Sequence, residues 1–199
     1  HLHTYHQEML GGLLSARAID DRGGAFIILE ALKRAKELGC RIGVYAATTV
    51  GEETTMRGAH WAGSAINPNV AIAVDVTHAR TGDAPQVIVK LGDGPNVDMG
   101  SNSNPKFAKR VIEVARAKQI PHIVTSCPAG SGTNAWPIQM QGQGVTTLVG
   151  SLPLKYMHSP VEMLRMSDVK NVGKLIAAFI ENFDGRLCLP PDGCTRWRP

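Results

Sequence analysis

Two adjacent carboxylates, Glu52 and Glu53, follow the largely apolar stretch 42–49 of this 199-residue chain. The stretch is rich in β-branched residues and is followed by Gly51, which predicts a buried strand over 41–50 with both acids at its C-terminal end. Ligands bind at that end of the strands in open α/β sheets. A divalent cation offsets the repulsion between such close carboxylates, so the pair indicates a metal site. Solvated acids at the start of a helix are the alternative interpretation.

Three further candidate residues lie where a predicted strand ends or a loop begins. Asp75 follows the apolar run 70–74, and Asp20 with its neighbour Asp21 lies at the entry to a predicted helix, where an aspartate can also be a simple N-cap. His158 lies in a predicted loop, where a single histidine is usually only a polar surface residue. Carboxylates combined with one imidazole suit zinc, cobalt or manganese better than calcium.

The elements that must position these residues alternate between strands and helices. Helical spacing predicts a helix over 25–38, a short one over 56–62, one over 105–118 capped by Asn104, and a closing helix over 166–183 with Ser167 as cap. Besides 41–50, strands are predicted over 70–74, 86–91, 120–124 and 144–150. This alternation predicts an α/β fold, a three-layer α/β/α sandwich around a mostly parallel mixed sheet.

The chain length suits one domain with a substantial core. We expect that domain over 15–184, with an N-terminal remnant or linker over 1–14 and an irregular, proline-containing tail over 185–199.

The composition argues against several classes of protein. The net charge is +4, but the 21 Lys and Arg residues are scattered among 17 acids, which does not favour nucleic-acid binding. No apolar run reaches the roughly 18 residues of a membrane span, and no leader is recognisable. The four cysteines are widely spaced, which favours reduced thiols in a cytoplasmic protein. A bridge between Cys188 and Cys194 is the alternative.

Five motifs in a fixed order resemble the glutamyl and leucyl aminopeptidase family that includes the tetrahedral aminopeptidases. They are AIDDRG at 18–23, GEE at 51–53 with RGA at 57–59, DVTHA at 75–79, KLGDGP at 90–95 and YMHSP at 156–160. The resemblance covers nearly everything from 15 to 183.

This resemblance implies a zinc-exopeptidase-like fold, a peptide substrate and a centre of two divalent metal ions, either zinc or cobalt, with manganese as a further alternative. By position in the motifs, Asp20 would bridge the two ions, Glu53 and His158 would complete the shell of one, and Asp75 would bind the other. Glu52 would be the general base. A metal lowers the pKa of bound water, so that a neighbouring glutamate can take the proton.

The chain also departs from the family pattern. The resemblance implies a further histidine ligand in an upstream His-x-Asp segment, followed by an inserted β-rich oligomerisation domain, and the 199 residues contain neither. His1 and His3 precede Asp20 but lie in a different motif. The family's Gly-rich loop ends in Asp, whereas this chain has Asn134, and the family has Gln where Gly51 stands. We interpret the chain as a fragment of such an enzyme.

The first hypothesis is therefore a metal-dependent aminopeptidase that removes N-terminal residues from peptides. The second is a catalytically impaired homologue that binds peptides or partners, motivated by the missing histidine. A glycan hydrolase ranks last, since adjacent Glu52 and Glu53 cannot flank a sugar from two faces at the required separation of about 5–10 Å. We expect this chain alone to be a monomer or weak dimer, and a larger homo-oligomer if the missing domain is present.

Overall fold

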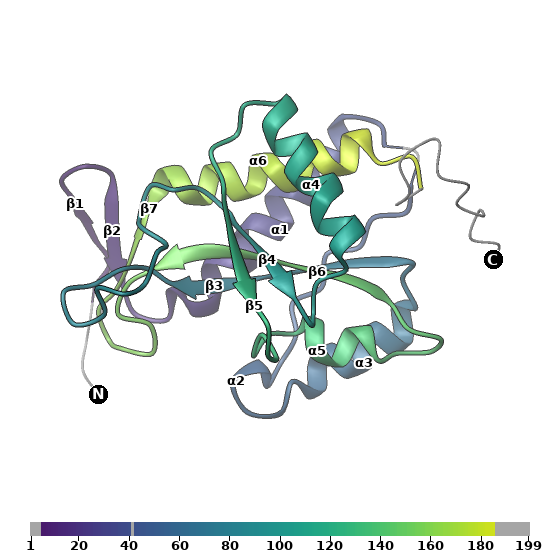
Figure 1. Cartoon of the computed structure of the whole chain (residues 1–199), viewed down its shortest axis with the longest axis horizontal. Helices are drawn as coiled ribbons and strands as arrows, with labels where there is room; N and C mark the ends of the chain where they lie inside the picture. Colours follow the sequence, from purple (N-terminus) through teal and green to yellow (C-terminus); the bar gives the residue numbers. More distant parts are fainter. Residues whose placement is uncertain (1–4, 41, 186–199) are drawn as a thin grey trace.

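The computed structural model describes residues 5–40 and 42–185, and within them it contains seven strands and six helices (Figure 1). The strands are β1 (Gln7–Met9), β2 (Leu13–Ala16), β3 (Val70–His78), β4 (Asn96–Gly100), β5 (Ile123–Cys127), β6 (Thr146–Leu154) and β7 (Glu162–Arg165). The helices are α1 (Ile19–Glu37), α2 (Glu52–Thr55), α3 (Arg57–Ile66), α4 (Pro105–Ala117), α5 (Ala135–Gln139) and α6 (Met166–Asn182).

Two sheets organise the chain. The central sheet has the strand order β3-β6-β4-β5, in which β3 pairs with β6 and β4 with β5 in parallel, while β4 and β6 are antiparallel. The second sheet, β1-β2-β7, is antiparallel throughout. The mixed, mostly parallel central sheet agrees with the prediction.

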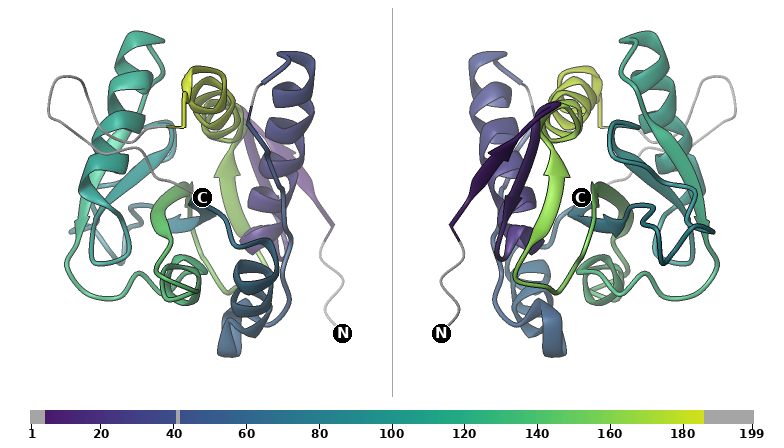
Figure 2. Two further views of the ribbon diagram at one scale, coloured as in Figure 1. Left: turned by 90° about the vertical axis from the view of Figure 1, so that its right-hand side faces the viewer. Right: turned by 90° about the vertical axis from the view of Figure 1, so that its left-hand side faces the viewer.

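Helices cover both faces of the central sheet. In Figures 1 and 2, α1, α4 and α6 lie on one face, and α3 and α5 lie on the other. One buried apolar cluster packs α4 and α6 against the sheet around Phe107, Leu148 and Phe179. A second packs α1, α6 and β7 together around Ile27 and Leu152. The α/β/α sandwich predicted from the sequence is confirmed.

The start of α1 carries the double aspartate. Asp20 and Asp21 are not helical, with φ/ψ of −76°/109° and −119°/54°, and the peptide bond between them is cis. The Asp21 carboxylate accepts a hydrogen bond of 2.7 Å from the Gly24 N–H. A Cβ atom on Gly24 would overlap that carboxylate, so any other residue there would displace the Asp21 side chain. The regular helix begins after this turn, close to the predicted start.

Capping explains where α4 and α6 begin. The Asn104 side chain accepts from the N–H groups of Lys106 and Phe107 at 3.0 and 3.2 Å, with Pro105 in the first helical position, as predicted. The prediction that Ser167 caps α6 is wrong. Arg165 stands at the N-cap with extended backbone angles, because β7 continues directly into the helix.

Two predicted strands do not form. Residues 42–49 have no ladder partner among the described residues. Half-buried and exposed residues largely alternate along them, as in a strand with one covered face, and Tyr45 is 73% exposed. Residues 86–91 are irregular, and two of their carbonyls accept hydrogen bonds from Arg80. Its backbone N–H donates to Val89 and its Nε to Val87.

Three other strands differ from their predicted bounds. β3 continues to His78, so Asp75 lies inside the strand and not after it. β5 and β6 begin three and two residues later than predicted, at Ile123 and Thr146. None of the helices described is long and apolar enough to cross a membrane.

Candidate metal centre

Side chains from three distant segments meet beside the start of α1. His158 Nε2 lies 3.1 Å from Asp20 Oδ2 and 3.2 Å from Glu53 Oε2. One ligand-type atom from each residue falls within 4.8 Å of the other two. Two carboxylates and an imidazole at this spacing form a ligand set that suits zinc and related divalent metals.

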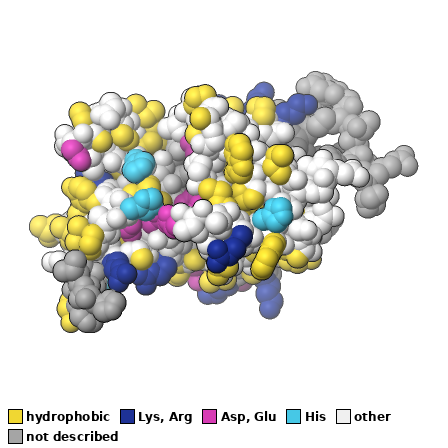
Figure 3. All heavy atoms as spheres, turned by 90° about the horizontal axis from the view of Figure 1, so that it is seen from below, with side chains coloured by type: hydrophobic (Ala, Val, Ile, Leu, Met, Phe, Trp, Pro, Cys, Tyr) yellow, Lys and Arg dark blue, Asp and Glu magenta, His cyan; other side chains and the backbone are white. Residues whose placement is uncertain are grey.

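The three side chains differ in their exposure. The Asp20 side chain is 7% exposed, whereas those of Glu53 and His158 are 54% and 64% exposed. They line a shallow pocket of about 300 Å³ together with residues 17, 18, 159, 160 and 162. Figure 3 shows acidic and histidine side chains lying side by side on one face of the molecule. Asp20 is therefore the buried end of a group that opens to solvent.

Local backbone geometry presents the two glutamates. The single turn of α2 lies between Gly51 and Met56, both left-handed, with φ of 73° and 52°. Gly51 accepts the N–H groups of Thr55 and Met56 at 3.0 and 2.7 Å, which closes the turn. Glycine adopts this conformation at little cost, which explains its presence beside the acids.

Glu52 lies next to the three ligand-type side chains. Burial raises the pKa of its carboxyl, and the charges of Glu53 and Asp20 raise it further. Its Oε1 atom is buried without a hydrogen-bond partner among the described residues. A buried acceptor of this kind is available to a water, a cation or a substrate proton.

Asp75 and Asp21 extend the carboxylate group inward. Burial raises the pKa of Asp75 to about 7, with contributions from Glu52 and Asp20, although a 2.8 Å hydrogen bond from the Val76 N–H lowers it. Burial and the charge of Asp75 raise the pKa of Asp21 to about 8. Neither aspartate belongs to the close group of three.

The carboxylates therefore repel one another. Burial raises the pKa of Asp20, and so does the charge of Glu53, while the His158 imidazole lowers it. A divalent cation is the partner that relieves such a cluster without protonating it. The residues present fit a metal on this ground, and the fit rests on Asp20, Glu53 and His158, with Asp75 behind them.

The sequence analysis missed Glu162, the first residue of β7, which is 2% exposed. Its Oε2 accepts from the N–H groups of Ile19 and Asp20 at 2.6 and 3.2 Å, and its Oε1 accepts from the His158 N–H at 3.0 Å. The available signal was its spacing of two residues from the apolar Leu164. In a strand this spacing places both side chains on one face, so a charged residue shares the inward face with Leu164.

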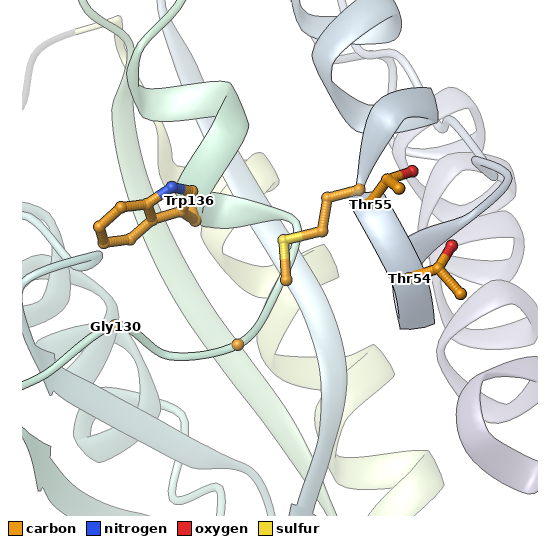
Figure 4. Close-up of a pocket in the computed structure, with 6 residues that line it drawn as sticks. Thr54, Thr55, Gly130 and Trp136 are labelled. Atoms are coloured by element: carbon orange, nitrogen blue, oxygen red, sulfur yellow. The ribbon is translucent and has the colours of Figure 1, made fainter.

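A second pocket adjoins α2. It has a volume of about 420 Å³ and is lined by Thr54, Thr55, Met56, Gly130, Gly132 and Trp136, none of which is charged. Figure 4 shows Trp136 and Gly130 on one side and Thr54 and Thr55 on the other. The Gly-rich loop is held in place by Asn102, whose side chain accepts from the Ser131 N–H at 2.7 Å, and by Asn134, which donates to Thr49 at 3.1 Å.

A layered α/β fold with a group of carboxylates and a histidine at the start of α1 is the framework of a metallopeptidase. Residues 2–175 match the M42 glutamyl aminopeptidase family, and the chain belongs to that family. The family resemblance inferred from the five motifs is thereby confirmed. Peptidases of the family depend on metal.

Individual relatives agree. The chain is 41% identical to a lysyl aminopeptidase of Pyrococcus furiosus over 165 residues, which is 82% of this chain and 47% of that protein. A TET aminopeptidase from a marine sediment archaeon of the Thaumarchaeota superimposes with a TM-score of 0.83 at 30% identity, covering 90% of this chain and 52% of that one. The Pyrococcus horikoshii TET1 peptidase gives a TM-score of 0.77 at 30% identity, covering 90% and 53%.

The chain thus spans about half the length of the relatives it matches. His1 and His3, considered as substitutes for the upstream ligand, lie outside the described residues, as does the Cys188–Cys194 pair. Cys40 and Cys127, the cysteines in the described part, are free thiols.

Proposed function

We propose that the protein removes N-terminal residues from peptides with a metal centre held by Asp20, Glu53 and His158. The observation that carries the proposal is the convergence of these three side chains within 4.8 Å. Asp75 is the proposed ligand of a second ion, which Asp20 would share. Zinc or cobalt is the proposed metal, with manganese as the alternative.

The bound metal would supply a Lewis acid that makes water acidic and polarises a peptide carbonyl. Glu52 is the proposed general base, because its buried Oε1 has no described partner and its pKa is raised. A carboxylate tuned upward accepts a proton from the attacking water and returns it to the leaving amine more readily than one at its ordinary pKa. Asp20, being almost buried, keeps one wall of the centre shielded from bulk water.

We propose that the uncharged pocket beside α2 receives the side chain of the substrate's N-terminal residue. Thr54, which lines this pocket, follows the proposed base Glu52 by two positions in α2, so the pocket lies close to the base along the chain. The walls favour an apolar side chain, because a charged one would lose its hydration without gaining a counter-ion.

A catalytically impaired binding module is the second candidate, and it is favoured by the position of Asp75 outside the close group of three. Metal content separates the two. A working pair requires about two ions per chain, whereas one ion or none supports the binding module.

Assembly is part of the proposal, since one relative's structure is described as a tetrahedron or a large octahedral shell. We propose that these 199 residues alone form a monomer or weak dimer, and that a longer protein containing the upstream domain forms a larger homo-oligomer. Light scattering measures both.

The decisive test is hydrolysis of aminoacyl-arylamides with added zinc, cobalt or manganese. Glu52→Gln removes the proposed base and should lower kcat at least about 100-fold while leaving metal content unchanged. Glu30→Gln, an exposed site on α1, is the matched control and should retain activity. Equal kcat for the Glu52→Gln variant and the unaltered chain would remove Glu52 from the chemistry.

A further inference from the structure

The buried carboxylate of Glu162 joins the two segments that carry Asp20 and His158. Its two oxygens accept three backbone N–H groups, those of Ile19, Asp20 and His158, at 2.6 to 3.2 Å. Two of these amides belong to proposed metal ligands themselves. The side chain therefore fixes the main chain from which each ligand projects.

The sheet brings Glu162 to this position. β7 pairs antiparallel with β2, and Glu162 lies opposite Ala16, three residues before Ile19. The same strand follows the turn that holds His158, whose φ of 62° turns the chain sharply. Glu162 thus lies between the two segments, and its side chain closes the gap between them.

An ionised carboxylate is the side chain best suited to this position. It has acceptors only, so both oxygens can receive N–H groups, whereas an amide of the same shape has one acceptor and one donor end. With glutamine at 162, at least one of the three backbone N–H groups would face an NH₂ group.

We propose that Glu162 is a positioning residue of the metal centre, which sets the separation of Asp20 and His158 without touching the metal. The inference rests on the proposed function, since it needs a metal at these ligands. Outer partners that orient metal ligands typically change metal affinity by about 10–100-fold when they are replaced.

The chain offers a matched control in Asp168, which is fully buried and accepts the N–H groups of Gly92 and Gly94 at 2.7 and 3.1 Å. Those contacts hold a loop that carries none of the proposed ligands. Asp168→Asn and Glu162→Gln therefore remove the same kind of buried carboxylate, one beside the centre and one away from it.

The experiment titrates zinc into the full chain at pH 7.5 against a chromophoric competitor, and records the melting temperature of each metal-free variant. Glu162→Gln should bind zinc about 10–100-fold more weakly. Asp168→Asn should lower the melting temperature but leave zinc affinity within about twofold, because distant sites act independently. Glu162→Asp keeps the charge but is one methylene shorter, so it should also bind zinc at least about tenfold more weakly.

Two results would overturn the positioning role: zinc affinity within twofold of the unaltered chain for Glu162→Gln, or full affinity in Glu162→Asp, which would make charge alone sufficient. If Glu162→Gln does not fold, the Glu162→Asp titration decides. Failure of the unaltered chain to bind zinc would instead overturn the proposed function itself, so the two failures are distinguishable.

Discussion

His158 is the one imidazole in a group otherwise made of carboxylates, and its two close contacts are both acidic oxygens. An imidazole binds a metal only in its neutral form, so a metal at this nitrogen takes the place of a proton.

The first prediction follows from this exchange. His158→Ala should lower zinc affinity by more than the 100-fold typical of an outer-shell change, since one of three side-chain ligands is lost. Zinc affinity of the unaltered chain should also fall between pH 7.5 and pH 5.5, because the pKa of Asp20 is raised and protons compete with the cation. Calorimetric titrations at both pH values measure this, and identical isotherms for the two proteins would exclude His158 from the centre.

The helix α2 forms one wall of the proposed substrate pocket. Its single turn places the proposed base at its start and the pocket wall at its end, where Met56 adopts a left-handed conformation that aspartate tolerates better than most residues.

We therefore predict that Met56→Asp changes specificity more than stability. An added carboxylate in an uncharged pocket should raise the ratio of lysyl- to leucyl-arylamide hydrolysis, in kcat/KM, by up to about fivefold, which corresponds to an ion pair of about 1 kcal/mol. Met56→Asn, which has the same shape without the charge, is the control. An unchanged ratio for the aspartate variant would place the substrate side chain elsewhere.

Elements with local causes could be predicted from the sequence, and those with distant causes could not. The start of α4 was predictable because Asn104 caps residues two and three positions away. The strands over 41–50 and 86–91 were predicted wrongly because a strand requires a partner, and an apolar β-branched run does not show whether a distant segment will pair with it.

The candidate site divides in the same way. Asp20, Glu53 and His158 were recognisable through their motifs, and the structure brings them together. Glu162 gave only a weak signal, its spacing of two residues from Leu164. All three of its hydrogen bonds go to backbone amides, and a backbone amide does not depend on the type of residue that carries it.

At the scale of the whole molecule, the buried carboxylates connect the metal centre to the stability of the fold. The pKa of Asp75 is about 7 and that of Asp21 about 8, both above the ordinary value of 3.8. A raised pKa in the folded state means that the metal-free fold retains protons which the unfolded chain has released. The contribution of these two carboxyls to the free energy of unfolding is therefore complete below about pH 4 and is lost as the pH rises through 7 to 8.

We predict that the metal-free protein melts at least about 5 °C lower at pH 8 than at pH 5. Asp75 alone, with a pKa of about 7, spans two pKa units above pH 5, each unit corresponds to about 1.4 kcal/mol, and each kcal/mol to about 2–4 °C at this size. Asp75→Asn should flatten this slope, and saturating zinc should reverse it. Differential scanning calorimetry with a chelator present measures the effect. A melting temperature that rises from pH 5 to pH 8 in the chelated protein would contradict it.

The hydrogen bond between Ile19 and Glu162 spans 143 residues, and this separation bears on how the protein is made. A ribosome adds about 5–20 residues per second, so roughly 7–30 s pass between the synthesis of Ile19 and that of its partner. For most of that interval Asp20 is present without His158 or Glu162. A nascent chain consequently lacks part of the proposed centre until β7 has been made, so we expect metal to be acquired only after that strand has left the ribosome.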